Sequence, residues 1–117
     1  MKVEEFISLL FEIELTTHIM HLQTTSYSQH IALNEIYSGI IDLRDRFTEG
    51  YQGKYGIVYN YSITKQPEGN DPVKYLLSKS KEIENYRLSL QDGFLQQIID
   101  DILELIYSTV YKLKNLK

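Results

Sequence analysis

Residues 28–50, SQHIALNEIYSGIIDLRDRFTEG, decide the fold of this chain. The apolar residues of this stretch recur at spacings of three and four, the period at which one face of an α-helix repeats. They are Leu33, Ile36, Ile40, Leu43 and Phe47. Because no proline interrupts the stretch, the pattern predicts one continuous helix with a buried apolar face over about residues 28–50.

Helices are also predicted on both sides of this stretch. The same spacing of apolar residues from Val3 to Met20 predicts a first helix over about residues 3–24. Asp71 followed by Pro72 is typical of a helix start, with Asp as the N-cap and Pro at the first helical position. This pair predicts a third helix over about residues 72–88, and dense apolar residues after Gly93 predict a fourth over about 93–116.

The connections predict how the helices are arranged. The polar turn at residues 23–26 is short, so the first two helices are expected to be antiparallel neighbours. Residues 50–70 hold four of the six glycines and form a long connection, with a short strand-like or helical piece expected near Ile57 to Ile63. The sequence therefore predicts an all-α, four-helix up-down bundle. The apolar stripe of its fourth helix is wide enough to contact another subunit, so a homo-oligomer, at least a dimer, is expected.

Composition bounds the class of protein. A chain of 117 residues is expected to form one domain, 1–117, and the absence of cysteine excludes disulfides and thiolate-ligated metals. The formal charge of −4 has the wrong sign for neutralising phosphates, which makes nucleic acid an unexpected partner. The start, MKVEEF, has acidic residues before its apolar stretch, where a secretory signal has a basic start, and no stretch predicts a membrane span. A cytoplasmic protein is therefore expected.

A polar face of the second predicted helix has the residue types of a metal site. His30, Asn34, Tyr37, Asp45 and Glu49 fall within roughly 120° of one another on a helical wheel, away from the apolar stripe. On the first predicted helix, Glu14, His18 and His21 likewise share one side. Imidazole and carboxylate groups at these spacings can bind iron, manganese or zinc. The alternative interpretation is a solvated helix face with ordinary histidines.

The stretch from residue 18 to 49 resembles the first two helices of the Dps group within the ferritin-like superfamily. The residues that carry the resemblance on the second helix are His30, Asn34, Tyr37, Asp45 and Glu49. The resemblance implies a ferritin-like fold and iron bound at a site shared by two subunits, with histidines from one chain and the distal carboxylates from the other. For the first helix it implies His18 by spacing or His21 by local context, with His21 slightly favoured.

One residue departs from the pattern of that family. Asn34 stands where the Dps group has an Asp, and an amide oxygen can coordinate iron without offsetting its charge. The resemblance therefore implies iron binding with a weakened ferroxidase activity, the oxidation of Fe(II) by oxygen or peroxide.

The long connection suggests a second kind of function. Its tyrosines, Tyr51, Tyr55, Tyr59 and Tyr61, suit a binding surface for a host protein or a small molecule, although they could also cover the end of the bundle. The whole chain resembles a group of short proteins encoded by large tailed phages, through the motifs at residues 21–33 and 51–56. This resemblance implies a viral origin, a location in the host cytoplasm, and a non-enzymatic accessory or anti-defence role as the alternative to iron chemistry.

Overall fold

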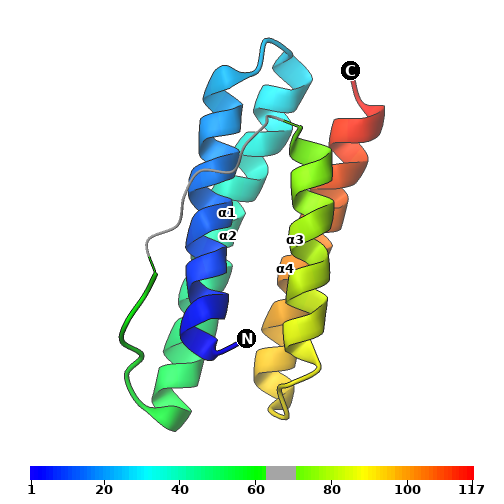
Figure 1. Cartoon of the computed structure of the whole chain (residues 1–117). Helices are drawn as coiled ribbons and strands as arrows, with labels where there is room; N and C mark the ends of the chain where they lie inside the picture. The colour runs from blue at the N-terminus through cyan, green and yellow to red at the C-terminus, as the bar shows by residue number, and fades with distance from the viewer. Residues whose placement is uncertain (63–70) are drawn as a thin grey trace.

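The protein is described by a computed structural model, which covers residues 1–62 and 71–117. This part of the chain contains four α-helices and no β-strand (Figure 1). The helices are α1 (Val3–Gln23), α2 (Tyr27–Tyr55), α3 (Pro72–Arg87) and α4 (Gly93–Asn115). The prediction of an all-α fold with four helices is confirmed for these residues.

The helices form a bundle in which α2 and α3 run in the same direction (Figure 1). Pro72, at the start of α3, lies in the same hollow as Met20 near the end of α1 and Leu33 near the start of α2. Asp92, at the start of α4, contacts Lys54 at the end of α2. The order of directions is therefore up, down, down, up, and differs at α3 from a strict up-down alternation because the second connection leads back along the bundle.

The core consists of the apolar stripes of all four helices. Phe6 is its aromatic centre: its ring stacks on Tyr86 of α3 at 4.4 Å and meets Phe47 of α2 edge-on at 4.8 Å. The other large side chains that are fully buried include Ile7, Leu10, Ile13, Leu33, Ile36, Ile40, Leu76, Ile83, Leu95, Ile99, Ile102 and Ile106. The periodic residues of the sequence analysis therefore face the interior, and their burial is the main source of stability.

Other helices of the same chain cover the wide apolar stripe of α4. The helix packs against both α2 and α3, and a side chain on its α2 side, Leu105, lies against Gly39. A methyl group at Gly39 would come within 2.9 Å of Leu105, so this glycine permits the close approach of α2 and α4. Tyr107 and Tyr111 of α4 remain exposed. Contact of α4 with another subunit stays a prediction, and the width of its stripe no longer requires one.

α2 continues past the predicted end near residue 50 and reaches Tyr55. The sequence predicts that the connection begins at Gly50, but this glycine lies inside the helix, where an added Cβ would come within 3.3 Å of the Phe94 ring. The helix ends instead at Gly56, whose φ of 102° is a conformation that favours glycine. Residues 57–62 have no regular secondary structure, and Ile63, the last residue of the predicted short element, lies outside the described residues.

The predicted cap of α3 is confirmed. The Asp71 carboxylate accepts hydrogen bonds from the backbone N–H groups of Val73 at 3.1 Å and Lys74 at 3.2 Å, and Pro72 occupies the first turn.

None of the helices that the structure describes is long and apolar enough to cross a membrane.

Candidate functional site

Two histidines join the end of α1 to the start of α2. The rings of His21 and His30 stack at 3.6 Å with an angle of 21° between their planes. Each ring also bonds through Nδ1 to the backbone carbonyl oxygen of the other residue, at 2.7 Å from His21 and 3.0 Å from His30. We call this pair the histidine clasp. If both Nδ1 atoms donate, each neutral ring keeps an unprotonated Nε2 as a free acceptor.

His18 and Asn34 lie next to the histidine clasp. The exposed ring of His18 stacks on Tyr37 at 3.9 Å and nearly parallel, and the Tyr37 hydroxyl donates a hydrogen bond to Asn34 Oδ1 at 2.6 Å. The Tyr37 ring also meets His21 at 5.1 Å. Four of the six predicted metal ligands, His18, His21, His30 and Asn34, therefore share one patch on the outer side of the α1–α2 pair.

The two predicted carboxylate ligands lie away from this patch. Asp45 and Glu49 are exposed and follow His30 on the same helix at distances of about 22 Å and 28 Å, from a rise of about 1.5 Å per residue. The Asp45 carboxylate lies 3.4 Å from the Arg44 guanidinium. Within residues 1–62 and 71–117, no three His, Asp or Glu side chains are close enough to hold one ion.

The stacking of the clasp also affects metal binding. The lone pair of an imidazole nitrogen lies in the plane of its ring, and the planes of His21 and His30 are nearly parallel. Two such lone pairs do not converge on a single ion, so a shared ion requires at least one ring to rotate. In the conformation described, the clasp acts as a structural link between α1 and α2.

Arg44 is an interior residue that sequence reasoning missed. Its side chain is 9% exposed, pairs with the Glu14 carboxylate and lies 3.9 Å above the Phe11 ring. Among the described residues, its Nε has no hydrogen-bond partner, and the same is true of Thr48 Oγ1 one turn further along α2. The sequence did contain a sign of this burial, because Arg44 lies beside the apolar stripe of α2. A basic side chain that is buried there needs a carboxylate as its partner. Glu14, assigned to the polar side of α1, is that partner.

Three of the four tyrosines of the predicted connection, Tyr55, Tyr59 and Tyr61, belong to an anchored segment, residues 55–62, that we call the tyrosine segment. Its main chain is fixed at two points, where the N–H of Val58 donates to the Gln52 side chain and the N–H of Ser62 donates to Ser8 Oγ, both at 3.0 Å. The Tyr61 ring meets Phe11 edge-on at 5.9 Å. The segment therefore lies along the outer side of α1 (Figure 1).

The side chains of the tyrosine segment divide into one that is buried and several that face solvent. Val58 is 8% exposed, whereas Tyr55, Ile57, Tyr59 and Tyr61 are 53%, 63%, 70% and 43% exposed. Asn60 adopts a φ of 66°, a value that few residues other than glycine adopt. An ordered, irregular main chain thus presents three exposed tyrosine rings, whereas the fourth predicted tyrosine, Tyr51, is half-buried in α2.

One end of the tyrosine segment is tied to the start of α4. The Tyr55 hydroxyl and the Lys54 ammonium both contact the Asp92 carboxylate. Hydrogen bonds, first from Lys54 and then from Tyr55, hold the pKa of the Asp92 carboxyl below its ordinary value. The bond to Asp92 likewise raises the pKa of the Tyr55 hydroxyl, because it disfavours the phenolate.

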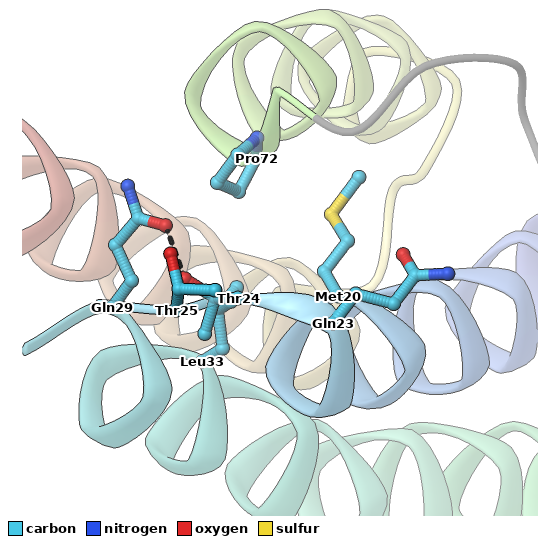
Figure 2. A pocket seen from close by; sticks show the side chains of 7 residues that line it. All are labelled: Met20, Gln23, Thr24, Thr25, Gln29, Leu33 and Pro72. Atoms are coloured by element: carbon cyan, nitrogen blue, oxygen red, sulfur yellow. Dashed lines mark hydrogen bonds between the residues drawn. The ribbon is translucent and has the colours of Figure 1, made fainter. Parts of the chain in front are cut away.

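Two hollows lie at opposite ends of the bundle. The first is about 270 Å³, adjoins the tyrosine segment, and is lined by Val3, Glu4, Tyr51, Tyr55, Gly56, Ile57, Val58, Tyr59 and Asn60. The second is about 360 Å³ and lies between the α1–α2 turn and the start of α3, with neutral linings throughout (Figure 2). Its lining residues are Met20, Gln23, Thr24, Thr25, Gln29, Leu33 and Pro72. The Thr24 hydroxyl donates to Gln29 Oε1 across the turn at 2.7 Å.

Comparison with known proteins identifies the family. Residues 21–113 match the proteins described as Family of unknown function (DUF5856). The chain belongs to this family. It is also 32% identical over 115 residues to an uncharacterised 14.6 kDa protein in the mobD-ri intergenic region of Enterobacteria phage T4, an alignment that covers 96% of this chain and 88% of the relative. No solved structure matches the chain.

The family match bears on one of the two resemblances. The likeness to phage proteins is confirmed, and the matched DUF5856 region contains the clasp residues His21 and His30 together with the tyrosine segment. Membership in the DUF5856 family carries no statement about iron, and the likeness to the Dps group rests on residues 18–49 alone.

Proposed function

We propose that this DUF5856 protein is a non-enzymatic helical binding module of a phage, which binds a host protein or a small molecule through the tyrosine segment. One observation carries the proposal: the side chains of Ile57, Tyr59 and Tyr61 face solvent while their main chain is anchored to α1 and α2. This role requires no residue from a second copy of the chain.

The physical argument is preorganisation. Binding through a loop normally costs the entropy of ordering its main chain, and anchors made before binding reduce that cost. Tyrosine then supplies a large contact area with only two side-chain torsions to fix and a hydroxyl to satisfy a polar partner. A fixed segment with exposed tyrosines is therefore a better recognition surface than the same residues in a free loop.

A comparison of variants in infected cells tests the proposal. We expect Tyr59→Ala to abolish co-purification of the partner and the biological effect of the protein, because Tyr59 is the most exposed tyrosine of the tyrosine segment. Tyr111→Ala is the matched control, since Tyr111 is an exposed tyrosine on α4. His30→Ala should also leave binding intact. Loss of binding in the control, or full binding by Tyr59→Ala, contradicts the proposal.

A second candidate function is iron binding at sites shared by two copies, in the manner of a Dps-like miniature ferritin. The observation that favours it is that His21 and His30 are fixed through Nδ1, which leaves Nε2 free, as is common for histidines that bind metals. The bundle also has one long crossover connection, as ferritin-like bundles do.

The geometry of α2 explains why two copies are needed. A two-fold axis that crosses α2 midway between His30 and Asp45, near Tyr37 and Ile41, brings the histidines of one copy to the carboxylates of the other. Ile41 is 37% exposed at this point and would supply apolar contact. The site would then combine His21 or His18 with His30 and Asn34 from one chain and Asp45 and Glu49 from its partner. Iron is the cargo, and its oxidation is weakened by Asn34.

Anaerobic Fe(II) titration of the metal-free protein by calorimetry tests this second function. Saturable binding that is lost in the double variant His30→Ala/Asp45→Ala supports it, and absorbance of a ferric product after addition of oxygen would add ferroxidase activity. Absence of stoichiometric binding to freshly purified protein rules it out. It ranks second because it requires a partner chain and the rotation of a clasp ring.

A further inference from the structure

The hollow beside the tyrosine segment has an unusual combination of linings. It lies where the first turn of α1 meets the last turns of α2, and residues 56–60 close one side. Three tyrosines line it, and the rings of two of them, Tyr51 and Tyr55, lie 4.8 Å apart at an angle of 36°. The carboxylate-bearing residue of this lining is Glu4. Among the described residues, no basic side chain lines this hollow.

These linings favour positive charge. The face of a tyrosine ring carries the negative part of the ring quadrupole and attracts cations within about 6 Å of its centre. Glu4 adds a full negative charge. The pKa of the Tyr86 hydroxyl is raised to about 12, mainly by burial and in smaller part by Tyr51 and Glu4, two residues that line the hollow.

We propose that this hollow binds an organic cation, either the guanidinium of an arginine or the ammonium of a lysine or polyamine, between the tyrosine rings and the Glu4 carboxylate. The inference rests on the proposed function and names the chemistry of its ligand. The Glu4 carboxylate would repel an anionic ligand, and no basic residue of the lining offsets that repulsion. At longer range, the net charge of −4 also favours a cationic partner.

An internal contact shows how a cation and a tyrosine ring meet here. The Lys54 ammonium lies 5.4 Å from the centre of the Tyr55 ring while it pairs with Asp92. The Lys54 ammonium is therefore already paired within the chain. In the part of the chain that the structure describes, no cation lies over the rings of Tyr51 or Tyr59, so these rings and Glu4 can take a cation from outside the chain.

Titration followed by NMR tests the inference with defined probes. The backbone amide signals of Ile57, Val58 and Asn60 are recorded while blocked arginine, blocked lysine, spermidine or blocked citrulline is added. Citrulline has nearly the shape of arginine without the charge. We expect saturable shifts with the three cations, at least five-fold weaker binding by Glu4→Gln, and no saturable shift with citrulline.

The matched control is Glu5→Gln, which removes the same charge from the next residue of α1. Glu5 accepts a hydrogen bond from the Lys2 N–H and lines a different hollow, so its loss should leave the titration unchanged. Tighter binding of an arginine or lysine peptide than of spermidine assigns the cation to a partner protein, and the reverse assigns it to a free polyamine. Equal shifts with citrulline, or unchanged binding by Glu4→Gln, overturn the inference.

This result is separable from that of the proposed function. Glu4→Gln preserves the exposed tyrosines, whereas Tyr59→Ala removes the most exposed of them. If the partner is captured through Tyr59 but the hollow shows no charge preference, only the cation inference fails. If Tyr59→Ala leaves capture intact, the binding role itself fails whatever the titration gives.

Discussion

Arg44 is the polar side chain whose loss should cost most stability. Its guanidinium is buried between Phe11 and Glu14, and Arg44→Met leaves the Glu14 carboxylate, 21% exposed, without its partner. Because Glu14 keeps some contact with water, we expect the free energy of unfolding to fall by about 2–3 kcal/mol, below the full cost of breaking a buried pair. Urea denaturation measures it.

The control for this substitution is Arg46→Met. Arg46 forms an exposed pair with Asp101 at 3.7 Å, with side chains 50% and 38% exposed, so its loss should cost less than about 1 kcal/mol. Equal effects of the two substitutions would mean that burial of Arg44 contributes nothing beyond a surface ion pair.

Tyr86 makes stability depend on pH in the alkaline range. Burial raises the pKa of its hydroxyl to about 12, above the ordinary value of 10.0. The folded state therefore keeps a proton that the unfolded chain loses, so this contribution to stability is complete below pH 10 and is lost as the pH rises toward 12. Tyr86→Phe should flatten the decline in unfolding free energy between pH 9 and pH 11.5 measured by urea titration. A decline as steep as that of the wild type would contradict the assignment.

At the scale of elements, the end of α2 predicts opposite effects of two alanine substitutions. Gly53 lies inside the helix, and an added Cβ there would meet open space, so Gly53→Ala should stabilise the protein by about 0.5–1 kcal/mol. Gly56 has a φ of 102°, so Gly56→Ala should destabilise it by more than about 1 kcal/mol. Thermal unfolding of both variants checks the signs, and stabilisation by Gly56→Ala would place the end of α2 elsewhere.

The histidine clasp should couple α1 to α2 energetically. Each single alanine substitution removes the stacking contact and the hydrogen bond of its own ring, whereas the other ring keeps its backbone acceptor, so the coupling measures the stacking. A double-mutant cycle of His21→Ala and His30→Ala should give a coupling of about 1 kcal/mol. The cycle is measured in EDTA to exclude metal, and additive effects would show that the rings act independently.

The elements also show which parts of the fold can be predicted from sequence. The start of α3 depends on Asp71 and Pro72, which act on their own neighbours, and the sequence prediction was right there. At Gly50, by contrast, α2 continues, and this glycine lies close to the Phe94 ring of α4, a residue far away in the chain. A glycine therefore signals a helix end in one context and close helix packing in another, and only tertiary structure separates the two.

At the scale of the whole molecule, the candidate sites were predictable only in part. The short α1–α2 turn brings His21 to His30, and helical spacing places His18 and Tyr37 beside them. Convergence with Asp45 and Glu49 cannot occur within one chain, because a rigid helix separates them from His30. The hollow beside Glu4 was also beyond prediction, since it forms where the first turn of α1, the end of α2 and the tyrosine segment meet.

The second candidate function, iron bound at a site shared by two chains, can be tested by mixing two variants that each lack Fe(II) binding. His30→Ala and Asp45→Ala proteins should each fail to bind Fe(II). In a two-fold dimer of one copy of each, one of the two sites combines the intact His30 of one chain with the intact Asp45 of the other. Random pairing after subunit exchange should therefore restore roughly a quarter of the wild-type binding capacity, measured by anaerobic titration. A site within one chain cannot be restored by mixing, so zero recovery from two stable, dimeric variants would exclude the shared site and leave the tyrosine segment as the functional surface.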